Sequence, residues 1–312
     1  MKRLPTLVTG ATGFVGGRLI QPGDRALVRR PSGLSDEIIG DLADPESVKR
    51  ACDGVMRVVH CAGFAHAKQT SSDDILHNAI NYEATRNLVW AAGRAGVRTF
   101  VFLSSVKAMQ SSGDGCVDEA WGGTPSGAYG NAKRRAEAEV IAAGRSFGMH
   151  VVNLRLAMVY GRGGRGNLYR MARGIKSGWF PPLPETGNKR SLVHVDDVVA
   201  AVRHVAEKPE ADGKTYIIAH HHAPSGREIY DAIRHCFGRS RVNWEVPAKF
   251  VRLIGRMGDV CPAPIGLGRI VNSDVVASLL STECYSPSRI EQELNWRAVV
   301  DLGAGLNEMI CD

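Results

Sequence analysis

Two short runs in the middle of the chain carry side chains that together could move a proton. The run YGNAK places Tyr129 and Lys133 four residues apart, so both lie on one face of a helix. A free phenol has a pKa of about 10, and a neighbouring ammonium group lowers that pKa. Upstream, FVFLSSVKA ends an apolar stretch at Ser105, whose hydroxyl can hydrogen-bond a carbonyl or alcohol oxygen. We therefore expect Tyr129 to act as a general acid or base, with Lys133 lowering its pKa and Ser105 polarising the reacting oxygen.

A glycine-rich segment near the start of the chain, TLVTGATGFVGGRL, follows a strand-like run and opens a helix-like one. Its spaced glycines allow a tight turn, the close approach of a pyrophosphate and the packing of the helix on the strand. The start of a helix also attracts an anion. The segment therefore predicts a dinucleotide-binding loop. Its expected cofactor contacts are Gly10, Thr12, Gly13, Phe14, Val15 and Gly16.

The second strand-like run, RALVRR, ends in Arg29 and Arg30. Dinucleotide sites that prefer NAD usually carry an acidic residue here, which binds the ribose 2′-hydroxyl, whereas an arginine accommodates the 2′-phosphate of NADP. We expect the two arginines to favour NADP(H), with NAD(H) as the other possible cofactor and a solvated basic turn as the alternative interpretation. Pro22 and Gly23 interrupt the preceding helix, which must therefore be unusually short.

Small and acidic residues after two further strands extend the predicted cofactor site. The run GDLAD follows an Ile-Ile pair and places Asp41, beside Leu42, where its carboxylate can accept a hydrogen bond from the adenine amino group. The run HCAG ends the fourth strand with Cys61, Ala62 and Gly63, whose small size lets the backbone lie against the cofactor. For Cys61, simple packing is an equal alternative.

Apolar runs and helical patterns alternate through the first half of the chain. The runs LPTLVTG, RALVRR, VMRVVHCAG, RTFVFLSS and MHVVNLRLAMVYG read as strands buried on both faces, with helices between them. This alternation predicts an α/β fold with a Rossmann-type doubly wound parallel sheet. The rhythm ends at Gly161. We therefore expect a dinucleotide-binding domain of residues 1–160 plus about 192–220, and a smaller, mostly helical substrate lobe of residues 161–191 and 221–312.

The composition indicates a globular protein, which we expect in the cytoplasm. The 312 residues are 44% hydrophobic, and 39 Lys and Arg against 32 Asp and Glu give a net charge of +7. No apolar window of about 18 residues and no signal core occurs, so we expect no membrane insertion. Because no basic, aromatic-interleaved stripe accompanies the charge, it favours a phosphate-bearing small molecule over nucleic acid as the partner.

Three other features of the sequence favour ordinary structural roles. The seven cysteines form an odd, scattered set without a CxxC pair, so we expect neither a disulfide framework nor a zinc site, and mostly reduced packing residues. The histidine run at residues 220–222 is interpreted as a solvated loop, and no metal is predicted. The run FVRLIGRMGDV predicts an apolar helix face in the core or at a dimer surface, with contact to a membrane surface as the remaining alternative.

In their order along the chain, these motifs resemble the extended short-chain dehydrogenase/reductase family, and within it the NAD(P)-dependent nucleotide-sugar epimerase/dehydratase group. The resemblance runs through TGATGFVGG, GDLAD, HCAG, NYEATRNLV, FLSSVKA, YGNAK, LRLAMVYGRG, RSLVHVDDVV and SRIEQELNW, nearly the whole chain. It implies that the glycine loop binds the pyrophosphate and that the serine, tyrosine and lysine named above perform the chemistry. It also implies that Asn81 supports the catalytic helix and that Leu156 and Ala157 line the nicotinamide.

The same resemblance makes Asn167 and Arg190 candidates for binding the diphosphate of a nucleotide-sugar substrate, because the planar guanidinium group pairs well with phosphate oxygens. The alternative for Arg190 is an ion pair with Asp196 or Asp197, which we interpret as structural residues. Lys107 is a further candidate for contact with the substrate phosphate or sugar, and a rim lysine is the simpler alternative. Family members often dimerise through helices that include the YGNAK one, so we expect a homodimer.

The resemblance leaves more than one reaction open. Dehydratases of the family usually carry Thr-Asp-Glu after the serine strand, and the sequence Ser-Val-Lys here disfavours dehydration. The chain most resembles 4-reductases of UDP-4-keto-6-deoxy-N-acetylhexosamines, which serve surface polysaccharide synthesis. Their consumption of cofactor in each turnover fits NADPH and an open nucleotide site. The alternative is a UDP-hexose 4-epimerase with tightly bound NAD, and a third interpretation is a non-catalytic NADP-binding regulator.

Overall fold

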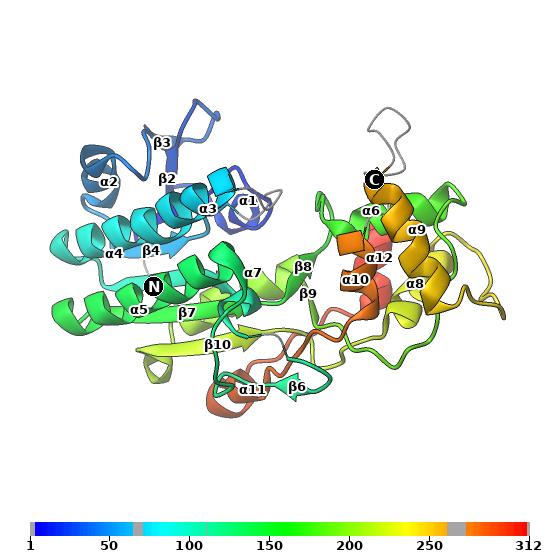
Figure 1. Ribbon diagram of the computed structural model, residues 1–312. Helices are drawn as coiled ribbons and strands as arrows, with labels where there is room; N and C mark the ends of the chain where they lie inside the picture. Colours follow the sequence, from blue (N-terminus) through cyan, green and yellow to red (C-terminus); the bar gives the residue numbers. More distant parts are fainter. Residues whose placement is uncertain (1–3, 65–70, 111, 261–272, 311–312) are drawn as a thin grey trace.

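Seven parallel strands form the central sheet, in the order β10-β7-β5-β4-β1-β2-β3 (Figure 1). The computed structural model describes residues 4–64, 71–110, 112–260 and 273–310. The sheet order reverses direction between β1 and β4, and such a reversal opens a ligand crevice at the carboxyl ends of the strands. The predicted Rossmann-type parallel sheet is confirmed. Its strands are β1 (Thr6–Thr9), β2 (Arg25–Val28), β3 (Asp36–Ile39), β4 (Arg57–His60), β5 (Thr99–Ser105), β7 (His150–Leu156) and β10 (Lys214–Ile218).

Successive residues of each strand pack on opposite faces of the sheet. In β5, Phe100 and Phe102 belong to one hydrophobic cluster, whereas Val101 and Leu103 belong to the other. Because helices cover both faces, most positions of the central strands are apolar, which explains the apolar runs of the sequence. The helices of the first face are α2 (Pro45–Cys52), α4 (Ala84–Arg94) and α5 (Gly127–Phe147), and those of the second are α1 (Gly16–Leu19), α7 (Val195–Val205) and α11 (Ser288–Leu294).

Helix α1 contains only the four residues Gly16–Leu19, as the sequence predicted. Ile20 is already extended, and Gly23 then adopts a φ of +84° in the turn before β2. Asp24 holds this turn from both sides, because its backbone N–H donates to the Gln21 carbonyl and its carboxylate accepts the Gln21 N–H at 2.9 Å. The first helix of the sheet is therefore little more than a single turn.

A second hydrophobic core lies within a cluster of helices on the right of Figure 1. Leu183, Ile233 and Leu306 are completely buried there. The short parallel pair of β8 (Met158–Tyr160) and β9 (Leu192–His194) follows β7 in the chain and precedes α7. The helices of the cluster are α6 (Asn167–Lys176), α8 (Gly226–Cys236), α9 (Ala248–Val260), α10 (Ser273–Leu280) and α12 (Leu302–Ile310).

A disulfide between Cys116 and Cys284 joins β6 (Cys116–Val117) to β11 (Cys284–Tyr285) across 168 residues of sequence. The expectation that the cysteines are reduced is wrong for this pair. Parallel pairing of the two short strands brings these Cα atoms to 4.4 Å, and nothing in the sequence spacing reveals that pairing. Cys52, Cys61 and Cys236 are not disulfide-bonded, and Cys261 and Cys311 lie outside the described residues.

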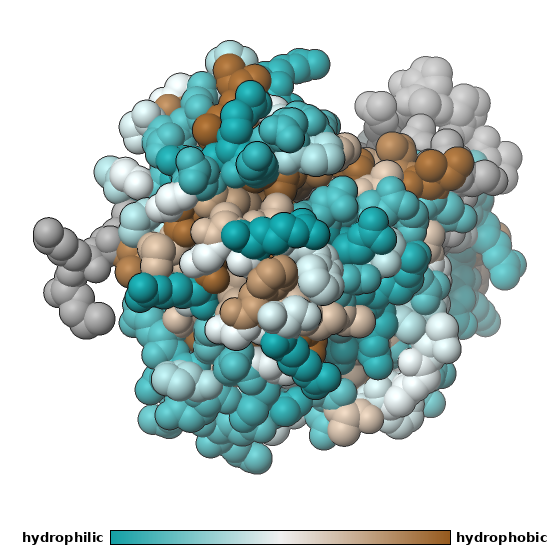
Figure 2. All heavy atoms as spheres, turned by 90° about the vertical axis from the view of Figure 1, so that its left-hand side faces the viewer, coloured by the Kyte–Doolittle hydropathy of each residue, from teal (hydrophilic) through white to brown (hydrophobic). Residues whose placement is uncertain are grey.

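One face of the molecule is mostly hydrophilic. Hydrophilic residues cover most of the face that lies on the left of Figure 1, with hydrophobic residues in smaller groups among them (Figure 2). Within the described ranges, no helix combines the length and the apolar character needed to cross a bilayer.

Candidate active site

The glycine loop between β1 and α1 turns so tightly that side chains would not fit. Gly10 adopts a φ of +68°, and a Cβ atom on it would lie 2.8 Å from the backbone nitrogen of Ala62. A Cβ atom on Gly16 would overlap the carbonyl group of Gly10. The N–H of Gly13 donates to the Gly10 carbonyl at 2.8 Å, which closes the turn. This bare backbone at the β1/β4 switch point fits the pyrophosphate of a dinucleotide.

The residues predicted to contact the adenosine are exposed at the carboxyl ends of β2 and β3. Arg29 and Arg30 follow β2 directly, and both are exposed. Asp41 follows β3 and is also exposed, with one carboxylate oxygen accepting the Ala43 N–H at 2.9 Å. Because β2 and β3 are neighbours in the sheet, the structure brings these residues to one edge, where they are free to meet a ribose phosphate and an adenine.

The predicted acid or base, Tyr129, lies in the first turn of α5 and is partly buried. Burial raises the pKa of its phenol, and a hydrogen bond with Ser105 lowers it. Ser105 is the last residue of β5, and its Oγ accepts the N–H of Lys107 at 3.2 Å. The structure therefore brings the tyrosine and the serine together, as the sequence predicted.

Lys133 lies one turn further along α5, with 4% of its surface exposed. Its ammonium group donates to the Leu103 carbonyl at 3.0 Å and lies 4.6 Å from the centre of the Phe102 ring. Burial lowers the pKa of Lys133 to about 8, and the nearby Glu137 carboxylate opposes that effect. Ser105, and not Lys133, is the group that lowers the pKa of Tyr129 in this arrangement.

A buried ionic network beneath Lys133 was missed by the sequence analysis. Glu137 Oε1 accepts hydrogen bonds from Ser104 Oγ at 2.6 Å and Arg155 Nε at 2.9 Å, and Oε2 accepts Arg155 Nη2 at 2.7 Å. All three residues are 4% exposed. The network joins α5 to β5 and β7, so it fixes the catalytic helix to the sheet. Its signal in the sequence was an acidic residue four positions after Lys133 on the apolar face of the helix.

A second missed residue, His77, packs against the catalytic tyrosine. Its ring meets the Tyr129 ring edge-on at 5.5 Å, and its Nδ1 lies 3.1 Å from the Asn81 amide nitrogen. Asn81 also exchanges two hydrogen bonds of 2.8 Å with the backbone of Phe64. Both residues come from one continuous helical stretch, α3 (Ser71–His77) and a π-helical segment (Asn78–Glu83). A Cβ atom on Gly63 would lie 3.1 Å from Asn81 Oδ1, so Asn81, Gly63 and Lys133 form one close-packed group.

The remaining predicted cofactor contacts line the same carboxyl edge. Leu156 ends β7 and Ala157 follows it, and the two residues are 9% and 5% exposed. The N–H of Ala157 donates to the Ile218 carbonyl in β10 at 3.0 Å. Cys61 follows β4 and is partly buried, and burial raises the pKa of its thiol to about 12. A protonated thiol at this position is compatible with both packing and cofactor contact.

A carboxylate links two of the predicted substrate contacts. Lys107 Nζ lies 2.5 Å from Glu283 Oε1, and Arg190 Nη2 lies 3.7 Å from Glu283 Oε2. Arg190 is buried, and its partner is Glu283 instead of the aspartates that we considered as an alternative. Asn167, the third candidate, is the first residue of α6 and is partly buried.

The two aspartates have structural partners. Asp197 accepts the backbone N–H groups of Val299 and Val300 at 3.0 and 3.1 Å. Asp196 lies 3.4 Å from Arg18 in α1. These contacts agree with the structural interpretation of both residues.

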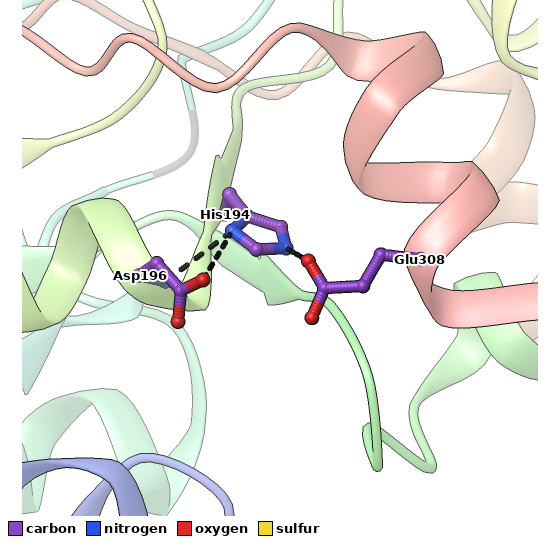
Figure 3. A group of neighbouring side chains, drawn as sticks. All are labelled: His194, Asp196 and Glu308. Atoms are coloured by element: carbon purple, nitrogen blue, oxygen red, sulfur yellow. Dashed lines mark hydrogen bonds and ion pairs between the residues drawn. The ribbon is translucent and has the colours of Figure 1, made fainter. Parts of the chain in front are cut away.

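His194, Asp196 and Glu308 form the one group of potential metal ligands found among the described residues (Figure 3). The buried His194 ring accepts the N–H of Asp196 on Nδ1 at 3.3 Å, and its Nε2 faces the Glu308 carboxylate at 3.4 Å. The group connects the start of α7 to α12, and so it ties the sheet to the helical cluster.

The model of the NAD dependent epimerase/dehydratase family matches residues 6–219, which include the glycine loop, the serine strand and the YGNAK helix. The chain belongs to this family. The extended short-chain dehydrogenase/reductase resemblance inferred from the sequence is therefore confirmed.

Named members of the epimerase/dehydratase family are similar over most of the chain. UDP-glucose 4-epimerase of Vibrio cholerae is 27% identical over 97% of this chain and 93% of its own length. N-acetyl-alpha-D-glucosaminyl-diphospho-ditrans,octacis-undecaprenol 4-epimerase of Escherichia coli O157:H7 is 28% identical over 67% of this chain and 65% of its own length. The structure of MoeE5 in complex with UDP-glucose and NAD has a TM-score of 0.76 at 23% identity and covers 98% of this chain and 97% of that one, which shows that the fold is shared.

Proposed function

We propose that this family member transfers hydride at C4 of a nucleotide-activated sugar and works as a 4-epimerase. The observation that carries the proposal is the contact between Tyr129 and Ser105 at the sheet edge that also holds the bare glycine loop. A phenol and a hydroxyl that converge there suit an alcohol–ketone interconversion beside a dinucleotide. The two 4-epimerases named above, similar over long stretches of the chain, support epimerisation.

Each residue of the site has a defined task in this proposal. When bound, the nicotinamide supplies or accepts the hydride. The Tyr129 oxygen takes the proton from the sugar hydroxyl on oxidation and returns it on reduction, and Ser105 Oγ hydrogen-bonds the same oxygen. Lys133, which donates to the Leu103 carbonyl and lies near the Glu137 carboxylate, keeps a cation one helical turn from Tyr129. Asn81 and His77 hold the segment against which Tyr129 packs.

The substrate diphosphate is proposed to bind between Lys107 and Arg190, with Asn167 as a further contact. Glu283 now neutralises part of that positive charge. A diphosphate carries more negative charge than one carboxylate and offers Arg190 a bidentate partner, so it competes with Glu283 for the same cations. Binding of the substrate diphosphate would then release Glu283 from its ion pairs with Lys107 and Arg190.

The second candidate is the 4-keto reductase of a UDP-deoxy-N-acetylhexosamine, working with NADPH. Exposed Arg29 and Arg30 at the end of β2 favour it, because they suit a 2′-phosphate. The four-residue α1 also leaves less cover beside the nucleotide loop, which suits a cofactor that leaves after each turnover.

One experiment separates these candidates. The purified protein is mixed with UDP-hexoses, UDP-N-acetylhexosamines and UDP-4-keto sugars, with NAD, NADH or NADPH, and nicotinamide absorbance and products are followed. Interconversion of C4 epimers without net loss of reduced cofactor supports the epimerase. Stoichiometric loss of NADPH on a keto sugar supports the reductase instead. Cofactor binding without turnover on the whole panel would favour a non-catalytic regulator.

Three further expectations accompany the proposed function. We propose a cytoplasmic homodimer, and sedimentation velocity of the purified protein tests its oligomeric state. We also propose the two-part division into a dinucleotide-binding domain and a substrate lobe at the boundaries given above, with one exception. Helix α11 lies within residues 221–312 but packs on the sheet, so it belongs with the dinucleotide-binding domain. The inclusion of β10 in the sheet and the separate core of the helical cluster support that division. Limited proteolysis that releases fragments at other positions would contradict it.

A further inference from the structure

Helix α9 carries an apolar surface that the structure leaves in solvent. Phe250, Leu253 and Met257 are 50%, 51% and 60% exposed. The opposite side of the helix is anchored, because Val251 is 3% exposed within the core of the helical cluster and α9 packs beside α10. The helix is thus held by one side and presents a second apolar side outward.

A basic stripe runs parallel to the apolar one. Lys249, Arg252 and Arg256 each stand one position before an exposed apolar residue, and all three are exposed. At about 100° per residue, each stripe spans about 60° of the helix surface, and the two stripes are neighbours. Lys249 Nζ lies 5.3 Å from the Phe250 ring centre, so the two stripes touch at this point.

This arrangement has the features of a helix that lies in a membrane interface. Such a helix buries its apolar stripe at the boundary between headgroups and acyl chains, while its basic side chains reach anionic headgroups. The charged ends of long lysine and arginine side chains can reach the headgroups while their methylene groups lie against the apolar region. Asp259 is the single acidic residue of α9, and Trp244, 61% exposed, precedes the helix by four residues and has the side chain typical of the interface.

We propose that α9 is the docking surface of this protein for an anionic lipid bilayer. The apolar stripe of Phe250, Leu253 and Met257 enters the interface, and the basic stripe beside it pairs with lipid phosphates. Charge complementarity favours a bilayer as the occupant, because the stripe is flanked by cations and the whole chain carries a net charge of +7. The contact is peripheral, and it holds the helical cluster at the membrane whichever sugar the active site accepts.

Vesicle flotation tests the proposal with the full-length protein. Vesicles that mix phosphatidylcholine with phosphatidylglycerol are compared with vesicles of phosphatidylcholine alone, at low and high salt. We expect binding to the mixed vesicles at low salt, at least about fivefold weaker binding to the neutral ones, and loss of binding as salt rises. Absence of binding to the mixed vesicles at low salt would overturn the proposal.

Matched variants assign the binding to α9. Leu253→Glu is expected to weaken binding about tenfold or more, because it places a charge in the apolar stripe. Val299→Glu is the control, since Val299 is 79% exposed and lies outside α9. Arg252→Gln with Arg256→Gln is expected to reduce binding to anionic vesicles by about tenfold and to leave the melting temperature unchanged. Equal effects of Leu253→Glu and Val299→Glu would overturn the assignment.

Self-association is the competing explanation for an exposed apolar stripe. If α9 instead joins two copies of the chain, Leu253→Glu lowers the oligomeric state in sedimentation velocity, and that result overturns the bilayer proposal. An unchanged oligomeric state together with weakened vesicle binding supports it. Activity on a water-soluble nucleotide sugar is expected to be unchanged in this variant, so failure of the proposed enzyme reaction remains distinguishable from failure of membrane docking.

Discussion

The two ends of the proposed dinucleotide site are built in opposite ways. At the nicotinamide end, Lys133 and Glu137 are buried, and each is held by hydrogen bonds to the sheet. At the adenosine end, Arg29, Arg30 and Asp41 stand exposed after their strands. The buried network thus holds the catalytic helix in place. The proposed cofactor preference depends instead on exposed side chains, which can be substituted without repacking the core.

The largest effect is expected from the reacting phenol itself. Tyr129→Phe removes the oxygen that would carry the proton and keeps the ring that packs against His77. Loss of a general acid or base costs about 10²- to 10⁴-fold in rate, so we expect kcat to fall by about 10³-fold. Steady-state turnover measures this, and cofactor fluorescence titration checks that binding survives. Turnover within tenfold of the parent would show that Tyr129 is not the acid or base.

The buried network predicts the next largest effect, on stability. Glu137→Gln leaves the Arg155 charge buried without its counter-ion, which costs about 3–5 kcal/mol in the free energy of unfolding. Denaturant unfolding gives the value. Glu139→Gln, two positions further on the same helix, is the control. Glu139 is less buried, and it accepts hydrogen bonds from Tyr82 in the π-helical segment and Trp90 in α4.

A double variant of the Glu137–Arg155 pair tests whether the loss of stability comes from the unpaired charge. Glu137→Met with Arg155→Met removes both charges, and we expect it to recover most of the lost stability because no unpaired charge remains. It also removes the carboxylate that raises the pKa of Lys133, so the pKa of Lys133 should fall below about 8. The alkaline limb of the kcat profile would then move to lower pH. An unmoved limb in a stable double variant would break the proposed link between Glu137 and Lys133.

A buried histidine near Lys133 should also make the stability of the protein fall at acidic pH. His60 is completely buried between Thr9 and Thr85, and burial together with the Lys133 charge lowers its pKa to about 3. The unfolded chain takes up this proton near pH 6.5, whereas the folded chain resists until about pH 3, so stability falls as the pH drops through this window. The slope from this group is at most about 1.4 kcal/mol per pH unit.

Replacement of the histidine tests that slope. His60→Gln keeps hydrogen-bonding capacity but removes the titration, so its unfolding free energy should depend less on pH between about 6.5 and 4.5. Chemical denaturation at a series of pH values measures the difference. Parallel profiles of the two proteins would show that His60 does not titrate as proposed.

The smallest effect is expected at the exposed adenosine end of the site, where a substitution should change the preference between NADPH and NADH. Arg29→Asp replaces a partner for the 2′-phosphate with one for the 2′-hydroxyl. We expect the ratio of the affinities for NADPH and NADH, measured by fluorescence titration, to fall by about tenfold or more. Stability should stay within about 0.5 kcal/mol, because the side chain is exposed. An unchanged ratio would remove the case for NADP.

Local pattern in the sequence predicted the sheet, the short first helix and the meeting of Tyr129 with Ser105. The sheet follows from periodicity and the short helix from Pro22 and Gly23. The meeting of Tyr129 with Ser105 follows from the expectation that a phenol and a hydroxyl act on the same oxygen. The partners that were missed, Glu137 with Arg155 and Glu283 with Arg190, are distant in sequence. Their pairing depends on how strands and helices pack, which no single run of residues encodes.

The disulfide between Cys116 and Cys284 turns more than half of the chain into a covalent ring of residues 116–284. A denatured chain that keeps this ring has fewer conformations to lose on refolding, which in a loop-entropy model favours the native state by about 5 kcal/mol. Glu283, which forms ion pairs with Lys107 and Arg190, is the residue before Cys284. The disulfide therefore adjoins the residues proposed to bind the substrate phosphates. The persistence of the folded protein, and of that charged group with it, then depends on the thiol–disulfide balance of its surroundings.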